Sequence, residues 1–317
     1  MQVILDTDIG DDIDDAFALA LLLRCPELTL AGVTTSITGP RKRSGHVRRM
    51  CQAAGEAFER IEVVDGAAGL LATRPRAGLL DRPYHYGQDC AADADAPDGS
   101  SKTRFLDMLL GHTGEVLVIG GLTNVGVALA VGGRSVRWRR LAVMAGEFQI
   151  AGRKEHNVTC DPESAHLVFA SGLPVDVIPW SIGPKVKLLE EDIARLREAA
   201  TGRPATGRPA TGTAPGRPDP LVALLVAWLE AFWQHVPGKT NMYDPMTILA
   251  LIRPELFTWK SGHVSVELRD EANMGLTRFE ESETGPHRVA FDVDADAARA
   301  FMVERICSGG GISSRVQ

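Results

Sequence analysis

The sequence predicts an α/β fold in which helices flank an open, mainly parallel β-sheet. Two observations carry this prediction. Short β-rich runs alternate with helical runs through the first half of the 317-residue chain, and alternation at this spacing is typical of βαβ units with parallel strands. Hydrophobic residues make up 44% of the chain and charged residues 24%, which is the usual composition of a globular protein with a buried core.

The individual elements follow in order along the chain. Short runs rich in Val, Ile, Leu and Thr predict strands over residues 3–5, 28–35, 61–64, 116–119, 141–144 and 175–178. Longer helical patterns predict helices over residues 16–23, 46–58, 106–110, 124–131, 162–171 and 221–233. Parallel sheets bind ligands at the carboxyl ends of their strands. Residues that directly follow a strand are therefore the candidates for a functional site.

We expect a single domain over residues 1–307. Residues 201–220 interrupt the pattern, because they contain TGRPA twice and consist almost wholly of Gly, Pro, Thr, Ala and Arg. Such a segment cannot bury an apolar face, so it predicts a flexible insertion. The Gly- and Ser-rich end of the chain predicts a disordered tail over residues 308–317.

Charge and cysteine content exclude several classes of protein. The formal net charge of −7 argues against a nucleic-acid surface built on a general basic field. No apolar run approaches the roughly 18 to 20 residues of a membrane helix, and the start MQVILDTD lacks the features of a signal peptide. Five widely spaced cysteines without a CxxC pair fit a reducing compartment. We expect a cytoplasmic protein with no nucleic-acid or membrane partner.

The strongest local signal is an aspartate cluster between the first strand and the first helix. Six aspartates fall within ten residues of the segment LDTDIGDDIDDA. So many carboxylates repel one another, and a divalent cation would compensate them; oxygen ligands favour calcium or magnesium over zinc. Asp14 and Asp15 would lie at a helix N-terminus, where backbone N–H groups also stabilise negative charge. The alternative is an acidic, solvated loop that caps the helix.

Three specific kinds of site start in this way. An EF-hand loop counted from Asp6 needs an acidic residue at its twelfth position, which is Phe17 here, so this kind is excluded. A magnesium-dependent phosphatase of the haloacid dehalogenase type also begins with a strand and Asp-x-Asp; without an equally clear later lysine and acidic pair, it remains the alternative. The third is a nucleoside hydrolase, whose fingerprint DxDxG followed by DDA resembles residues 6–16.

Further blocks of the nucleoside hydrolase pattern occur in the same order along the chain. Residues 31–35 (AGVTT) resemble the second-strand block GITT, and residues 118–124 (VIGGLTN) match G-x-LTN. Residues 155–163 (EHNVTCDPE) resemble E-[FH]-N-x-x-x-DPE. Residues 243–245 (YDP) stand at the HDP or YDP step, and residues 275–278 (GLTR) resemble a late G-x-TR turn. Over nearly its whole length, the chain resembles the inosine-uridine-preferring nucleoside hydrolase family.

The resemblance implies a nucleoside hydrolase-like fold with a Rossmann-like core around a calcium ion. The implied calcium ligands are Asp8, Asp15, the Thr123 carbonyl and Asp244. Cleavage of an N-ribosidic bond passes through an oxocarbenium-like sugar that water attacks. Calcium would orient that water and lower its pKa, and Asp8 would take its proton.

The resemblance also implies the residues that bind the substrate. Asp14, Glu155 and Asn157 are the expected ribose contacts. Gln149 lies near the position of a further family asparagine and can donate a hydrogen bond, and His85 resembles a histidine of the mobile loop near the base. The implied substrate is a small-molecule nucleoside, and the implied assembly is a homodimer or a homotetramer.

Departures from the family pattern leave alternatives open. Tyr243 stands in place of a histidine that often protonates the leaving base; a phenol with a reference pKa near 10 does this less readily. We therefore assign Tyr243 to the catalytic residues and include a modified nucleoside among the substrates. Two extra residues after Gly10 allow Asp12 to replace Asp14 or Asp15 at the metal. A catalytically weakened ribosyl-binding homologue is a further alternative. Residues 238–240 (GKT) copy the end of a P-loop, but the required first glycine is missing, so a triphosphate site is rejected.

Overall fold

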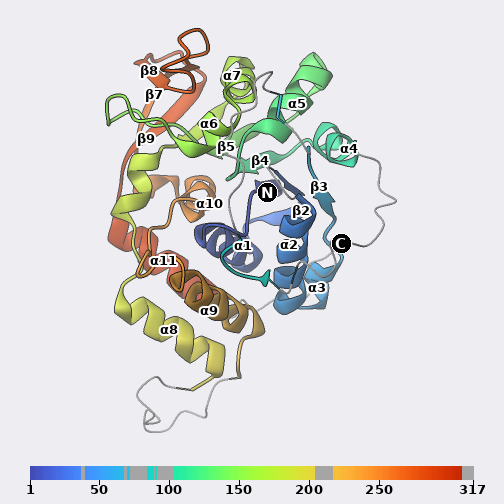
Figure 1. Cartoon of the computed structure of the whole chain (residues 1–317), viewed down its shortest axis with the longest axis vertical. Coiled ribbons are helices and arrows are strands. Elements are labelled where there is room, and N and C mark those ends of the chain that lie inside the picture. Colours follow the sequence, from blue (N-terminus) through green and yellow to red (C-terminus); the bar gives the residue numbers. More distant parts are fainter. Residues whose placement is uncertain are drawn as a thin grey trace.

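The computed structural model describes residues 1–36, 40–67, 70–71, 84–88, 90, 103–203 and 217–308. These residues form a nine-stranded sheet in the spatial order β3-β2-β1-β4-β5-β6-β9-β7-β8 (Figure 1). The strands are β1 (Gln2–Thr7), β2 (Thr29–Thr35), β3 (Val63–Asp65), β4 (Glu115–Val118), β5 (Arg140–Met144), β6 (Val175–Ile178), β7 (Phe257–Val266), β8 (Thr277–Glu281) and β9 (His287–Val293). Neighbours from β3 to β9 pair in parallel, and β7 runs antiparallel to β8 and β9. The predicted open, mainly parallel sheet is confirmed.

Helices cover both faces of the sheet (Figure 1). One layer contains α1 (Asp14–Arg24), α2 (Pro40–Ala54), α8 (Glu190–Thr201), α9 (Pro220–Trp233), α10 (Pro245–Ile252) and α11 (Ala295–Cys307). The other contains α4 (Arg104–Gly111), α5 (Thr123–Gly132) and α7 (Pro162–Ala170). Shorter helical turns lie in the connections: α3 (Glu56–Glu59), η2 (Gly133–Ser135), α6 (His156–Cys160), η3 (Trp180–Lys185) and η4 (Pro254–Leu256).

The two layers divide the hydrophobic core into two clusters that meet at the sheet. In β1, Val3 and Leu5 pack in the cluster with α1, whereas Ile4 packs in the cluster with α5 and α7. Successive side chains of a strand point to opposite faces, so a central strand that is covered on both faces is apolar at every position. This explains why residues 3–5 of β1 form a continuous apolar run rather than an alternating one.

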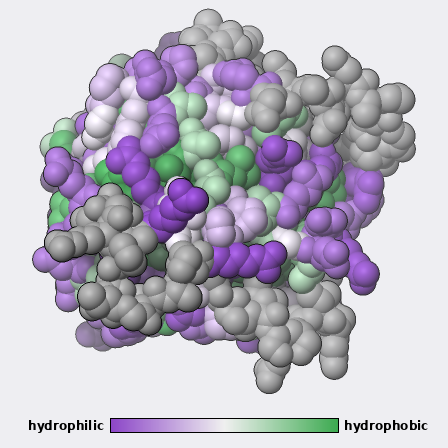
Figure 2. Space-filling model, turned by 90° about the horizontal axis from the view of Figure 1, so that it is seen from below, coloured by the Kyte–Doolittle hydropathy of each residue, from purple (hydrophilic) through white to green (hydrophobic). Residues whose placement is uncertain are grey.

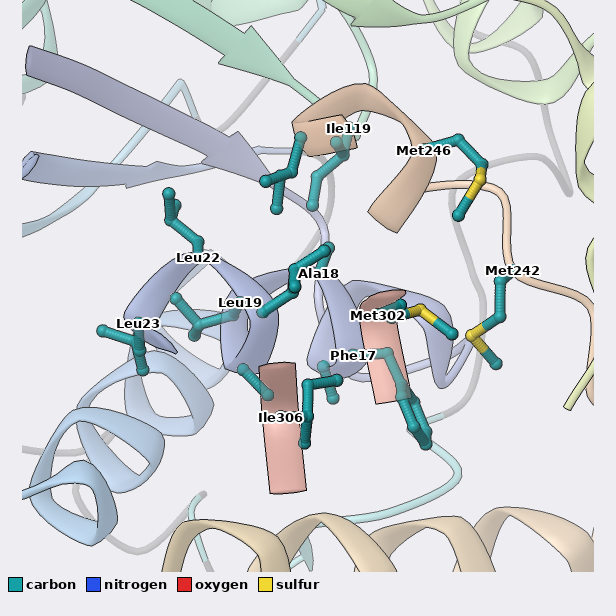
Figure 3. Close-up of a cluster of buried hydrophobic side chains, with 14 of the residues drawn as sticks. Phe17, Ala18, Leu19, Leu22, Leu23, Ile119, Met242, Met246, Met302 and Ile306 are labelled. Atoms are coloured by element: carbon teal, nitrogen blue, oxygen red, sulfur yellow. The ribbon is translucent and has the colours of Figure 1, made fainter. Parts of the chain in front are cut away.

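Helix α1 is buried along its whole length. Figure 3 shows Phe17, Ala18 and Leu19 of α1 in one hydrophobic cluster with Met302 and Ile306 of α11. A helix that is enclosed on all sides has little freedom to shift, because protein interiors are close-packed. The packing therefore fixes the first turn of α1, which carries Asp14 and Asp15.

Some elements differ from the sequence predictions. The predicted helix over residues 46–58 is two helices, α2 and α3, because Gly55 between them has a φ of +114°, which a helix does not accommodate. Helices α8, α10 and α11 and strands β7 to β9 all lie after residue 178, where the sequence predicted only the helix over residues 221–233. In strand β7, the last five residues alternate between buried and exposed, as in a strand that packs one face on the core.

The first and last residues of the predicted insertion over residues 201–220 belong to helices, because α8 includes Thr201 and α9 begins at Pro220. Residues 204–216 and residues 309–317 lie outside the described part of the chain, so the flexible insertion and the disordered tail stay predictions. Strands from both sides of the insertion share one sheet. A single domain over residues 1–307 likewise stays a prediction.

The surface is mixed in character. Among the described residues, none of the helices has the length and apolarity that crossing a bilayer requires. The large hydrophobic side chains that are exposed there are Met1, Leu71, Val131, Ile150 and Leu189. Figure 2 shows hydrophilic and hydrophobic side chains side by side on the lower face of the molecule.

Candidate active site

A pocket of about 170 Å³ lies at the carboxyl ends of the central strands. Its walls come from the acidic loop after β1, from Ile119 after β4, from Met144 at the end of β5, and from the segments around residues 155–157 and 239–244. This edge is where open parallel sheets bind their ligands. The pocket is therefore the candidate active site.

Three buried carboxylates converge at this pocket. One oxygen from each of Asp14, Asp15 and Asp244 lies within 4.8 Å of the other two. The Asp14 carboxylate accepts hydrogen bonds from the backbone N–H groups of Tyr243 at 3.1 Å and Asp244 at 3.3 Å. The hydroxyl of Thr7 donates to Asp15 at 2.6 Å. The acidic loop and the segment before α10 are thus joined directly, although more than 220 residues separate them in sequence.

Burial and mutual repulsion both disfavour the ionised forms of these acids. Burial raises the pKa of Asp14 to about 8, and the Asp12 carboxylate adds to the shift. Burial, followed by repulsion from neighbouring aspartates, raises the pKa of Asp15 and of Asp244 well above the usual range. Asp8 contributes to both of these shifts and lines the pocket. A hard cation would restore the ionised forms, so this all-oxygen cluster could hold a metal ion.

A buried guanidinium lies against the acidic loop. Nη1 of Arg43 is 3.7 Å from the Asp11 carboxylate and donates to the Ile9 carbonyl at 3.1 Å. Burial alone would lower the pKa of Arg43, but the negative charges of Asp8 and Asp11 raise it. Arg43 thus stays charged and offsets part of the negative charge from behind the pocket.

The acidic loop is held in shape by the segment 84–88. The Gly10 N–H donates to the Tyr86 hydroxyl at 3.0 Å, and that hydroxyl donates to the Asp12 carbonyl at 2.7 Å. Gly10 has a φ of +132°, and a Cβ there would meet the Tyr84 ring at 2.5 Å. Glycine is therefore required at this position.

Backbone hydrogen bonds fix the opposite wall. The Glu155 carboxylate accepts from the N–H groups of Gly146, Asn157 and Val158 at 2.7 to 3.1 Å. Burial raises the pKa of Glu155, and these hydrogen bonds counteract part of the shift. The Asn157 amide donates to the carbonyls of Ile119 and Met144. An amide held through its NH₂ group retains an oxygen that can accept from a hydroxyl.

Tyr243 and Trp180 form an aromatic part of the lining, with ring centroids 6.0 Å apart. Gly183 lets the Tyr243 ring approach, because a Cβ at residue 183 would lie 1.9 Å from the ring atom Cδ1. Burial raises the pKa of Tyr243, whereas a hydrogen bond from Asn241 at 3.3 Å and the nearby Lys239 lower it. The phenol thus remains protonated at neutral pH.

The structure pairs Asp12 with Lys239, which also lines the pocket. Repulsion from Asp12 raises the pKa of Asp14 after burial does, so Asp12 lies near the three converging acids. The acids whose oxygens converge are Asp14, Asp15 and Asp244, without Asp12. This arrangement favours Asp14 and Asp15 over Asp12 as candidate metal ligands, and the choice among them stays a prediction.

The structure brings most of the predicted site residues together, but not all. The predicted residues that line the pocket are Asp8, Asp14, Asp15, Glu155, Asn157, Tyr243 and Asp244. Thr123, Gln149 and His85 are not among the lining residues. The Thr123 hydroxyl donates to Asp161. The exposed Gln149 amide donates to the Ser181 hydroxyl and the Phe291 carbonyl.

His85 contacts the acidic loop rather than the pocket itself. Its Nδ1 lies 2.8 Å from the Asp11 carbonyl oxygen, and its ring stacks on His235 with centroids 5.1 Å apart. Its backbone N–H donates to the Gly10 carbonyl. In this conformation His85 supports the loop that carries the acids.

Sequence reasoning missed three residues of this region. Trp180 belongs to none of the family blocks that the sequence displays, so it gave no signal. Lys239 was considered only as the end of a failed P-loop, although it precedes the YDP step by four residues. Arg43 ends the basic run RKR, which is typical of a solvated helix face, yet its side chain is buried. Buried arginine is rare without a charged partner, and the abundance of aspartates was the available clue.

Comparison with known proteins agrees with this geometry. The family model described as inosine-uridine preferring nucleoside hydrolase matches residues 3–300. Uridine nucleosidase 1 of Arabidopsis thaliana is 26% identical over 335 residues, which cover 96% of this chain and 93% of that protein. Pyrimidine-specific ribonucleoside hydrolase RihA of Citrobacter koseri is 29% identical over 295 residues, which cover 87% of each protein.

Solved structures share the fold. A plant nucleoside hydrolase, the PpNRh1 enzyme, superposes with a TM-score of 0.70 at 23% identity and covers 97% of this chain and 99% of its own. A purine-preferring ribonucleoside hydrolase from Gardnerella vaginalis superposes with a TM-score of 0.75 at 19% identity and covers 99% and 100%. Together with the family match, this decides between the phosphatase and the nucleoside hydrolase interpretations. The chain belongs to the inosine-uridine preferring nucleoside hydrolase family and is a hydrolase that acts on N-glycosyl bonds.

Proposed function

We propose that this protein hydrolyses the N-glycosidic bond of a ribonucleoside to free base and ribose, with calcium bound by Asp8, Asp15, Asp244 and the Thr123 carbonyl. The observation that carries the proposal is the convergence of Asp14, Asp15 and Asp244 at the pocket. Buried carboxylates that repel one another need a compensating cation. The three acids of this described cluster offer only oxygen donors, and such a donor set favours calcium or magnesium.

A divalent cation at this position would orient a water, lower its pKa and hold ribose hydroxyls. The chain's own residues would do the rest. Asp8 would accept a proton from the attacking water, since its carboxylate lines the pocket beside the cluster. Asp14, Glu155 and Asn157 would hold the ribose hydroxyls, because a site built to hydrogen-bond a hydroxyl rejects analogues that lack it.

The proposed substrates are ribonucleosides, including modified ones. Relatives that are named for uridine and pyrimidine ribonucleosides support a nucleoside substrate. Tyr243 would face the leaving base as a hydrogen-bond donor, and Gln149 and His85 would reach the substrate only after movement of their segments. We further expect a homodimer or homotetramer in the cytoplasm, and size-exclusion chromatography with light scattering measures the assembly.

A nucleoside panel tests this function. The purified protein is incubated with uridine, inosine, cytidine, adenosine and a set of modified ribonucleosides, and released ribose is assayed as reducing sugar with and without a chelator. We expect ribose release that chelation abolishes and calcium restores. Asp8→Asn should lower kcat by at least 100-fold. Ribose release that is indifferent to chelation would overturn the metal-dependent mechanism.

A catalytically weakened ribosyl-binding protein is the second candidate, because Tyr243 stands where a stronger acid is expected. It predicts a different result in the same samples. Calorimetry would detect ribose binding, while no nucleoside of the panel would be cleaved. In that case Asp8→Asn would change the affinity for ribose without any turnover to lose.

A further inference from the structure

Lys239 places a fixed positive charge in the pocket. It is the only lysine or arginine among the described lining residues. Its ammonium pairs with the Asp12 carboxylate and lies 5.9 Å from the centroid of the Tyr243 ring and 6.0 Å from that of Phe232. Its side chain is 32% exposed, so the charge is neither buried away from a ligand nor free in solvent.

The backbone of Lys239 is anchored on both sides. Its N–H donates to the Val236 carbonyl, and its carbonyl accepts from the Trp233 indole N–H at 2.9 Å. Two residues later, Asn241 bridges to Lys187, and the Met242 N–H donates to the Val186 carbonyl. The ammonium group therefore belongs to a turn whose backbone is held by hydrogen bonds on both sides.

Cleavage of a C1′–N bond places negative charge on the departing base. When the bond breaks, its electron pair goes to the base, which then needs either a proton or a nearby cation. The Tyr243 hydroxyl accepts a hydrogen bond from Asn241 and is electrically neutral, whereas the Lys239 ammonium carries a full positive charge. The ammonium keeps its charge at neutral pH, because Asp12 and Asp14 lie near it.

We propose that Lys239 stabilises the departing nucleobase through its ammonium group, and this inference rests on the proposed function. The oxygen of water forms a bond to C1′ while the C1′–N bond breaks. One water proton goes to the Asp8 carboxylate and the other stays on the new ribose hydroxyl. The base leaves as an anion paired with Lys239 and takes up a proton from solvent, to which Asp8 later releases its own.

Two substrates with different leaving groups test this role. Uridine has a poor leaving group, whereas p-nitrophenyl β-D-riboside releases p-nitrophenolate, an anion that is stable without help. We expect Lys239→Met to lower kcat on uridine at least 100-fold, the range observed when one preorganised donor to a developing negative charge is removed. On the p-nitrophenyl riboside, kcat should change less than fivefold. Lys239→Arg, which keeps the charge, should stay within tenfold of the wild type on both substrates.

Two further variants separate this role from a purely structural one. Asp12→Asn breaks the same ion pair but leaves the ammonium in place, so any loss should be equal for the two substrates. Lys187→Met removes an exposed lysine of the adjoining segment and should change neither rate. Thermal melting of each variant confirms folding before the kinetics are compared.

The possible results are distinct. A loss that is confined to uridine in Lys239→Met supports the inference. Equal losses on both substrates, or no loss on either, would overturn the role of Lys239 while leaving the hydrolase function intact. A wild-type protein that cleaves neither substrate would overturn the proposed function, and this inference with it.

Discussion

The carboxylate of Asp14 accepts a hydrogen bond of 3.3 Å from the backbone N–H of Asp244, a residue 230 positions later in the sequence. This contact joins the first turn of α1 to the start of α10 and sets the Asp244 carboxylate beside Asp15. The site therefore depends on a junction between two segments that are 230 residues apart in the sequence. Changes at this junction should separate metal binding from folding.

Asp14→Asn keeps an oxygen that can accept the two backbone N–H groups but removes the charge. Because the pKa of Asp14 is raised to about 8, the ionised carboxylate is costly in the metal-free protein. We expect the variant to melt at or above the wild-type temperature in chelator at pH 8, to gain less from calcium, and to lose at least 100-fold in kcat/KM. Differential scanning calorimetry and ribose release measure these effects.

Asp176→Asn is the matched control, since Asp176 is a buried aspartate that pairs with Arg140 and Arg288 outside the pocket. It should lower the melting temperature but keep the full gain from calcium. If Asp14→Asn retained that gain and full activity, the junction would have no part in the site.

Calcium should stabilise the protein more at high pH than at low pH. Asp15 and Asp244 have pKa values well above 3.8 in the metal-free fold, so the folded protein holds protons that the unfolded chain releases. Stability without metal therefore falls as pH rises above about 4. Calcium displaces those protons and removes this loss. At 100 times its Kd, calcium adds about 2.7 kcal/mol.

Melting temperatures in chelator and in calcium, measured from pH 5 to pH 9, test this relation. The difference between the two curves should widen with pH. In Asp15→Asn, the difference between the two melting curves should depend less on pH. A difference that is constant across this range would show that calcium binds elsewhere.

Gly183→Ala should displace Tyr243, because the new Cβ would lie 1.9 Å from the ring atom Cδ1. Overpacking of this kind costs roughly 1 to 3 kcal/mol, and the shift of the ring should also lower kcat. In a Tyr243→Ala background the same substitution should cost less than about 0.5 kcal/mol. Urea unfolding of the four proteins measures this coupling.

Gly111→Ala serves as the comparison for this series, since nothing described lies within 4 Å of a Cβ at that position. It should be neutral. If Gly183→Ala cost the same with and without the Tyr243 ring, the backbone at residue 183 would need glycine for another reason.

Arg43→Met should destabilise the fold by about 3 kcal/mol, because it removes a buried positive charge from beside Asp11 and Asp8. Arg104→Met is the control: it removes an exposed partner of Glu62 and should cost less than about 1 kcal/mol. Denaturant unfolding measures both. A similar small cost for the two variants would mean that Arg43 does not compensate the acidic loop.

The sequence predicted the parts of the site that follow from local patterns. An apolar strand, a run of aspartates and an apolar helix lie next to one another in the chain, so their meeting at a sheet edge required no long-range information. Asp244 could be assigned only through the family resemblance, because α10 brings it to the site from the far end of the chain. Lys239 was missed for the same reason, since its partner Asp12 is 227 residues away.

Gln149 shows why a matching position in the sequence does not determine where a side chain lies. Glu147 accepts the backbone N–H groups of Phe148, Gln149 and Ile150. This tight turn exposes the Gln149 side chain, which bonds to Ser181 instead of lining the pocket. The hydrogen bonds of the turn, which the sequence alone does not reveal, decide where the Gln149 side chain points.

Calcium binding and ribose release, measured on the same preparation across a series of calcium buffers, test the central claim most directly. The account predicts one high-affinity calcium per chain, a rate of ribose release that rises with its occupancy, and loss of both in Asp15→Asn and Asp244→Asn. Full ribose release at free calcium far below the measured Kd, or calcium binding unchanged in both variants, would contradict it.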